Sequence, residues 1–145
     1  MKIKFIKVHT FKDLTFSILG IFVGAALFFL HAGLGLFIAV CGVFTLLFWK
    51  TGYKVEGDDT LLRRQLLDLS QSCRPSIMDF LSGKDVVPDI RTGNEGGVVQ
   101  LEVWYSDTAK VAYARLYDFV NYTYEQATDI VELHDARADR LISRL

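Results

Sequence analysis

Two long uncharged runs near the N-terminus constrain this chain more than any other feature. Leu14 to Leu30 is seventeen residues long and Leu34 to Trp49 sixteen, and neither contains Asp, Glu, Lys or Arg. A helix needs about 20 apolar residues to cross a bilayer, so each run would borrow flanking residues, Phe11 on one side and Thr51 to Tyr53 on the other. A domain of this size would struggle to bury both runs. The sequence therefore predicts a membrane α-helical hairpin of two transmembrane helices over residues 14–53, with its turn at His31-Ala32-Gly33.

The charges beside the two runs predict their orientation. Residues 1–13 form a basic N-terminal flank with four Lys and one Asp, and Lys50 and Lys54 follow the second run. Positive flanks stay on the cytoplasmic side, so we expect an integral membrane protein with both termini in the cytoplasm, as in a bacterial inner membrane, and membrane lipid as a partner. A cleaved signal peptide is less consistent with the sequence, because the second run follows at once and no small-residue cleavage site ends the first.

Small residues indicate how the two helices pack. The candidate packing residues are Gly20, Gly24, Gly35, Ala39 and Gly42. Small side chains let helix backbones approach closely in lipid. A turn near residue 32 would bring Gly24 close to Cys41 and Gly20 close to Thr45. Two interpretations stay open: these residues pack the helices of one chain, or Gly20 and Gly24 join copies of the chain in a homo-oligomer.

Charge and cysteine content exclude several classes of function. Residues 1–50 hold five Lys and one Asp, whereas residues 51–145 hold eleven Lys plus Arg and sixteen Asp plus Glu. Binding to a phosphate backbone needs clustered cations, so the acidic second part predicts no nucleic-acid partner. Cys41 and Cys73 lie in different parts of the chain, and no CxxC, HExxH or Cys/His cluster is present. We therefore expect no disulfide, no metal and no cofactor.

Residues 54–145 are expected to form a small cytoplasmic α+β domain that begins with helices. After a short extended exit at Lys54–Gly57, Asp58-Asp59-Thr60 supplies side chains suited to a helix N-cap. An amphipathic helix is predicted by the helical spacing of Leu62, Leu66, Leu69 and Cys73. Pro75 then ends that helix or starts a second, shorter one.

The short second helix would contain Ile77, Met78, Phe80 and Leu81 and end at Gly83. Lys84 to Gly97 is a predicted loop with turn residues at Thr92–Gly97. It is not a phosphate-binding loop of the GxxxxGK[ST] type, because its glycines precede a strand and no such motif is present.

The region from Val98 to Phe119 gives the clearest β signal, a hairpin whose loop is Ser106–Ala109. Pairing Tyr105 with Lys110 makes one face wholly apolar, with Val99, Leu101 and Val103 opposite Leu116, Ala114 and Ala112. The other face mixes aromatic and charged residues, from Val98 and Gln100 to Trp104. We expect this hairpin to belong to an antiparallel sheet of three to four strands. The predicted Leu62 helix would pack against the apolar face, and helices would cover that face only.

The mixed face of this hairpin supplies the candidate partner-binding residues. They are Trp104, Tyr113, Arg115 and Tyr117. Aromatic side chains combine an apolar body with a polar tip and are enriched at interfaces. Tyr122 and Tyr124 could extend this patch, whereas the alternative is simple cross-strand pairing that stabilises the sheet.

Asn121 breaks the alternation, and the following stretch from Tyr122 to Leu133 fits a strand or a helix. Asp135 as an N-cap before Ala136–Ile142 favours a strand followed by a terminal helix.

No catalytic site is predicted. His134 has Asp135 as its sequence neighbour, but adjacent side chains do not face each other on a helix or strand. Cys73 stands beside Arg74 without a predicted base, and no serine lies in a GxSxG motif. We expect a non-catalytic membrane protein whose domain binds a protein partner as an accessory subunit. The alternatives are self-assembly through Gly20 and Gly24 and, third, an enzyme or ligand sensor.

Overall fold

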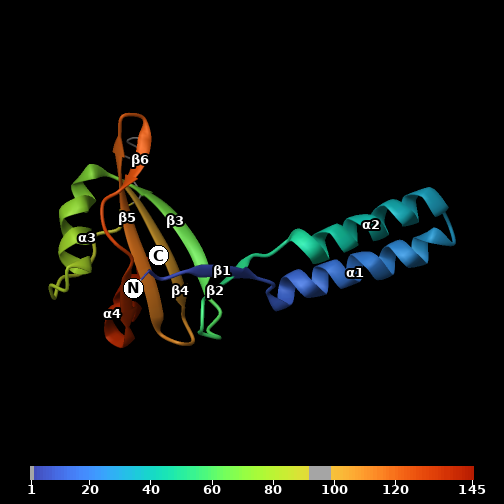
Figure 1. Cartoon of the computed structure of the whole chain (residues 1–145), viewed down its shortest axis with the longest axis horizontal. Coiled ribbons are helices and arrows are strands. Elements are labelled where there is room, and N and C mark those ends of the chain that lie inside the picture. The colour runs from blue at the N-terminus through green and yellow to red at the C-terminus, as the bar shows by residue number, and fades with distance from the viewer. Residues whose placement is uncertain (1, 92–98) are drawn as a thin grey trace. The chain divides into compact units, whose positions relative to one another are not determined.

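A computed structural model describes residues 2–91 and 99–145 of the chain (Figure 1). Within these residues, seven strands form two sheets and are joined by four α-helices and one 3₁₀ turn. The chain divides into two compact units, Lys4–Gly57 and Asp58–Leu145, and Lys2 and Ile3 belong with the second. The fold is therefore a small α+β protein.

The first unit consists of two apolar helices between two short strands. Helix α1 (Phe11–Phe28) and helix α2 (Ala32–Phe48) pack side by side, with His31 as the residue that precedes α2. Strands β1 (Phe5–Val8) and β2 (Gly52–Val55) pair antiparallel beside the open ends of the helices. The strand in the basic N-terminal flank was not expected from the sequence.

The prediction of a hairpin of two transmembrane helices is wrong. In the described residues only α1 is long and apolar enough to cross a membrane, by length and composition alone, because α2 has 17 residues. The residues that would have lengthened the second helix are used differently, since Gly52 pairs with Val8 and Tyr53 with Lys7 in the two-stranded sheet. At about 1.5 Å per residue, α2 spans only about 26 Å.

The carboxylate of Asp13 links the start of α1 to the residues that follow α2. Asp13 lies in the first turn of α1, where its carboxylate accepts a hydrogen bond from the Thr10 amide at 2.9 Å. It also accepts hydrogen bonds from the Thr51 amide at 3.0 Å and the Thr51 hydroxyl at 2.9 Å. Because Thr51 follows α2, one buried carboxylate holds the start of α1 against the exit of α2.

The second unit is built on a five-stranded antiparallel sheet in the order β3-β4-β5-β6, with β7 also paired to β5. Strand β3 (Arg63–Leu69) occupies the residues for which the leucine spacing predicts a helix, so that prediction is wrong. Leu67 and Leu69 point to the core and pair with Leu101 and Val99, whereas Leu66 is exposed. Seven cross-strand pairs to β4 outweigh the local helical spacing.

Strands β4 (Val99–Ser106) and β5 (Val111–Val120) form the expected hairpin with a shifted register. Tyr105 pairs with Ala112 instead of Lys110, and Val103 with Ala114 instead of Ala112. The shift is two residues, and an even shift leaves every side chain on its predicted face. The apolar face is therefore the core side, while Val98 and the turn residues Thr92–Gly97 lie outside the described residues.

Among the described residues, helices cover only the apolar face of the sheet, but the predicted Leu62 helix is not one of them. After the 3₁₀ turn η1 (Gln71–Cys73), α3 (Arg74–Leu81) begins with Pro75 in its first turn and is followed by Gly83 at φ +98°, as predicted. Helix α3 takes the place of the predicted Leu62 helix and shares the core with α4 (Asp135–Ile142). The fully buried core side chains include Leu69, Ile77, Phe80, Leu101, Leu116, Leu133 and Leu141.

The ambiguous stretch after β5 is extended, so the helical alternative is wrong. Strand β6 (Thr123–Gln126) and strand β7 (Val131–His134) both pair with β5, and α4 follows directly. Asn121 and Tyr122 form a two-residue turn between β5 and β6 with φ of 49° and 65°. Two successive positive φ angles are the signature of a type I′ turn.

Candidate functional site

The sheet face opposite the core carries a charge cluster centred on Glu102. Strand β4 supplies Glu102 and Trp104, and β3 supplies Arg64. The register places Glu102 opposite Arg115 and Trp104 opposite Tyr113, so alternate residues of neighbouring strands meet on one face. This is the face on which the sequence placed the candidate partner-binding residues.

Three side chains bind the Glu102 carboxylate. Arg64 Nε donates to one oxygen at 2.7 Å, and Arg115 Nη2 donates to the other at 2.7 Å. The Tyr117 hydroxyl donates to that second oxygen at 2.9 Å. With its side chain almost fully buried, Glu102 is compensated by two guanidinium groups, as a charge in this position requires.

Stacking of rings and a guanidinium completes the cluster. The Arg115 guanidinium carbon lies 4.8 Å from the Tyr117 ring centroid and 5.5 Å from the Trp104 ring centroid. Both distances fall within the range of a cation–π contact. Arg115 is thereby held by a carboxylate and two rings at once.

The surroundings shift the acidities of the cluster. Burial alone would raise the pKa of Glu102, but the hydrogen bonds from Arg115, Arg64 and Tyr117 outweigh it and lower the pKa below its usual value. Burial, together with a hydrogen bond to Glu132 at 3.0 Å, raises the pKa of Tyr113 to about 12. Burial and the bond to Glu102 likewise raise the pKa of Tyr117. At neutral pH the cluster is a fixed carboxylate with protonated phenols, which suits a supporting role better than proton transfer.

The structure brings the four predicted partner-binding residues together on one face of the sheet. They are less exposed than a contact surface requires. Trp104 and Tyr113 are each 4 % exposed, and Arg115 and Tyr117 are partly buried in the cluster. A hollow of about 480 Å³ opens beside Arg115, lined also by Lys2, Ile3, Gln126, Asp129 and Ile130. The role of these four residues in a partner contact stays a prediction.

The five candidate packing residues lie between α1 and α2 with a different pairing from the predicted one. Gly24 faces the backbone of Ala39, and Gly20 lies closest to Gly42. A methyl group on Gly24 would overlap Ala39, and one on Gly35 would overlap Phe28. The observed neighbours lie two and three residues before the predicted ones, Cys41 and Thr45, because α1 ends at Phe28 and α2 begins at Ala32, so the turn comes earlier in the chain than the predicted His31-Ala32-Gly33.

Other residues considered from the sequence take structural places. His134 Nε2 lies 3.1 Å from Glu132, and Cys73 is fully buried in the core. Among residues 2–91 and 99–145, no group of three His, Cys, Asp or Glu side chains is placed to hold a metal ion.

Sequence reasoning named Tyr122 and Tyr124 only as a possible extension of the patch and did not show that they belong to an exposed apolar feature of their own. Phe119, Val120, Tyr122 and Tyr124 stand at the end of the β5–β6 hairpin, and we call this set the aromatic tip. Tyr122 is 94 % exposed, and the Phe119 and Tyr124 ring centroids are 5.1 Å apart. Asn121-Tyr122 between two strand-like runs was the available signal, since Asn favours the first position of a type I′ turn.

Comparison with known proteins adds no relative: no protein-family model, curated protein or solved structure matches this chain.

Proposed function

We propose that this protein is a non-catalytic, membrane-tethered binding protein whose α+β domain docks a protein partner. The exposure of the aromatic tip carries the proposal. Tyr122 extends almost its whole ring into solvent, and Phe119 and Val120 beside it are about 40 % exposed. Aromatic residues in such positions are enriched at protein interfaces because they supply contact area at a small entropic cost.

The Glu102 cluster supports the tip. Tyr117 belongs to the cluster and lies two residues before Phe119 on the same strand, so both side chains stand on the same face of β5. The ion pairs of Glu102 join β3, β4 and β5 in the middle of the sheet, from which β5 continues to the tip. A rigid support lowers the entropy lost when a partner binds.

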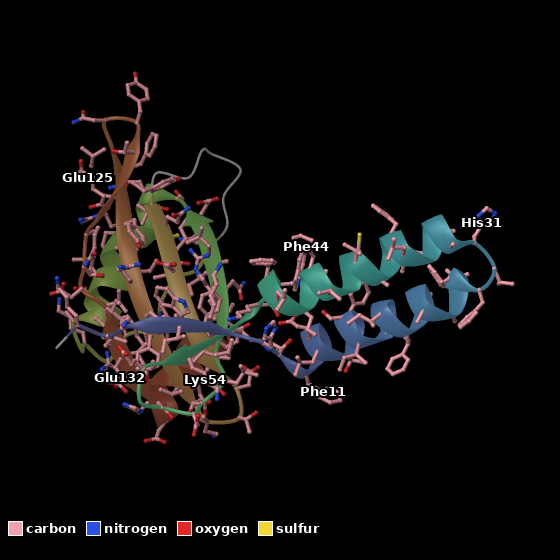
Figure 2. The ribbon with its side chains drawn as sticks, turned by 45° about the vertical axis from the view of Figure 1, so that its right-hand side comes forward. Phe11, His31, Phe44, Lys54, Glu125 and Glu132 are labelled. Atoms are coloured by element: carbon pink, nitrogen blue, oxygen red, sulfur yellow. The ribbon has the colours of Figure 1, made fainter. Side chains whose placement is uncertain are left out.

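The tether in this proposal is α1. Its outward side chains are large and apolar, with Phe16 74 % and Phe22 70 % exposed, and those of α2 are similar, as Phe44 illustrates in Figure 2. An apolar surface of this extent needs a cover, and a lipid bilayer is the cover that suits an 18-residue apolar helix. The Lys residues before α1 favour the cytoplasmic side for the N-terminal flank.

Self-assembly through Gly20 and Gly24 has less support. Gly24 is buried against Ala39 of the same chain, so the contact that a homo-oligomer would use is occupied.

Site-specific photocrosslinking tests the proposal. The full chain would carry benzoylphenylalanine in place of Tyr122 and, as the matched control, in place of Asp107 in the turn at the other end of β5. Irradiation of intact cells should join another polypeptide to position 122 and not to position 107. Equal adducts at both positions, or adducts consisting only of two copies of this chain, would rule out the proposed docking role.

The tether has its own test. The protein should stay with the membrane fraction after washing at high pH, which releases peripheral proteins. Release into the wash would contradict the membrane part of the proposal and leave the docking part to be judged by the crosslinking result.

A further inference from the structure

The aromatic tip is held in a conformation that its residues do not prefer. Asn121 and Tyr122 both have positive φ, 49° and 65°. Asn tolerates this region, whereas a bulky residue such as Tyr is an outlier there. The turn presents Tyr122 outward at a conformational cost, and its exposed ring gains no packing within the domain in return.

The two strands that lead to the tip carry two carboxylates, Asp118 on β5 and Glu125 on β6. Asp118 is directly opposite Glu125 across the β5–β6 pair, and like charges in that arrangement repel. The repulsion is relieved at Asp118, where Arg74 of α3 donates two hydrogen bonds of 2.7 Å to the carboxylate.

Glu125, unlike Asp118, is not compensated by a cationic side chain among the described residues. It is exposed at the hairpin, where Figure 2 labels it, and no ion pair to it occurs among the residues that the structure describes. The exposed Tyr122 ring and the uncompensated Glu125 carboxylate therefore lie at the same end of the hairpin, whereas Phe119 and Tyr124 lie on the face opposite Glu125. Rings bind cations through their faces, and carboxylates bind them directly.

We propose that the aromatic tip and Glu125 bind a Lys- or Arg-rich segment of the partner protein. This inference rests on the proposed docking function and specifies the chemistry of the partner. A guanidinium or ammonium group of the segment stacks on Tyr122, and a second one pairs with Glu125. The uncompensated charge of Glu125 attracts such a segment and disfavours anionic lipid headgroups as the occupant.

A peptide-binding experiment tests the charge preference. The full chain, reconstituted in nanodiscs of phosphatidylcholine, is titrated with a fluorescent peptide that alternates Arg and Thr and with a counterpart that alternates Glu and Thr. Binding is followed by fluorescence anisotropy. The Arg peptide should bind and the Glu peptide should not, and raising the salt concentration should weaken the binding severalfold because exposed charges are screened.

Three variants locate the contact. Tyr122→Ser should weaken binding of the Arg peptide about tenfold, as expected for an exposed aromatic anchor. Glu125→Gln should weaken it about threefold, as for one exposed ion pair. Asp107→Asn removes the same charge at the other end of β5 and should leave binding unchanged. Equal losses in Glu125→Gln and Asp107→Asn would show a general charge effect and overturn the site.

The two proposals fail separately. If crosslinking at position 122 captures a partner but the Arg and Glu peptides bind alike, the docking function is supported and the inference of a Lys- or Arg-rich segment is wrong. If the peptides bind alike and Tyr122→Ser abolishes attachment of the nanodiscs to phosphatidylglycerol vesicles, the tip binds lipid and the inference is overturned. If the Arg peptide binds at the tip while crosslinking captures nothing, the charge preference holds and the docking function fails.

Discussion

The two units of this protein bury opposite kinds of side chain. In Lys4–Gly57 the buried residues are Asp13, Ser17 and small residues such as Gly24, while Phe16 and Phe22 are exposed. In Asp58–Leu145 the buried residues are mainly aliphatic, and Glu102 is the one charged residue that is buried among those described. The first unit is held by close backbone approach and a few hydrogen bonds, and the second by burial of apolar area. The same chain therefore follows two rules of packing, and each can be tested separately.

The largest expected effect concerns β3 in the second unit. Leu69→Ala removes a fully buried side chain and should destabilise the domain by about 2–5 kcal/mol. Leu66→Ala, three residues away on the exposed side of the strand, should cost less than about 1 kcal/mol. Denaturant unfolding followed by Trp fluorescence measures both. Equal losses would restore the helical interpretation of this segment, in which both leucines share a stripe.

The apolar surface of the first unit gives the next largest effect. Phe22→Lys places a charge at the middle of α1 on its exposed side, which costs about 2.5–3.5 kcal/mol if that side faces lipid. The variant should leave the membrane fraction in part, whereas Phe11→Lys at the end of the helix should not, because Lys there can reach the headgroups. In water both exposed positions would accept Lys equally, so identical fractionation would show that α1 is not lipid-covered.

The Glu102 cluster in the second unit contributes a pH-dependent part of the stability. Its folded-state pKa is lowered from a usual value near 4.5, so the stabilisation is complete above about pH 4.5 and is lost as the pH falls through the folded-state value. Glu102→Gln should cost about 1.5–3 kcal/mol at pH 7, the range for hydrogen bonds to a charged group.

Chemical denaturation of the wild type and the Glu102→Gln variant at several pH values checks this sign. The difference in unfolding free energy should narrow below pH 4.5, because Gln has no proton to take up. If the difference in unfolding free energy did not change with pH, the shape of the Glu102 side chain, and not its charge, would account for the stabilisation. Arg74 likewise lowers the pKa of Asp118 through its hydrogen bonds, so Asp118 adds its own loss of stability as the pH falls through its folded-state value.

In the first unit, we expect the contact between α1 and α2 to be destabilised by adding side-chain volume, not by removing it. Gly24→Val would place side-chain atoms against the Ala39 backbone, which cannot move aside, and should cost about 1–3 kcal/mol. Gly33→Ala, where nothing lies within 4 Å, is the matched control and should be neutral or slightly stabilising. Thermal unfolding by circular dichroism in a non-ionic detergent compares them. If Gly24→Val melts like Gly33→Ala, the two helices do not pack as closely as Gly24 and Ala39 indicate.

The sequence predicted those features that depend on alternation or on local breakers. The two faces of the β4–β5 hairpin follow from alternation and survive the two-residue error in register, and Pro75 marks the start of α3. Features that depend on distant partners were not predictable. Leu62 to Cys73 has helical spacing, but β4 offers it a strand partner that local pattern cannot reveal. Likewise, β1 becomes a strand only because β2 lies beside it.

The candidate site shows the same division. Alternation placed Trp104, Tyr113, Arg115 and Tyr117 on one face, but it could not show that two of them are buried. Nor did it identify Glu102 as the centre of the cluster, because the burial of a charge depends on Arg64 from another strand. The tip depends on two backbone angles at a turn, which pattern alone suggests without revealing the exposure of Tyr122.

The smallest effect on stability separates the fold of the tip from its use. Gly adopts positive φ without strain, so Tyr122→Gly should leave the domain as stable as the wild type or more stable by up to about 1 kcal/mol. The same variant should lose the contact at the tip and bind the Arg peptide about tenfold more weakly. Unfolding and peptide titration on one sample give both numbers. A clear loss of stability would mean that Tyr122 contributes to the fold, and its exposure would then no longer argue for a partner. Unchanged or higher stability together with weaker binding would show that the Tyr122 ring does not stabilise the domain and serves a contact with another molecule.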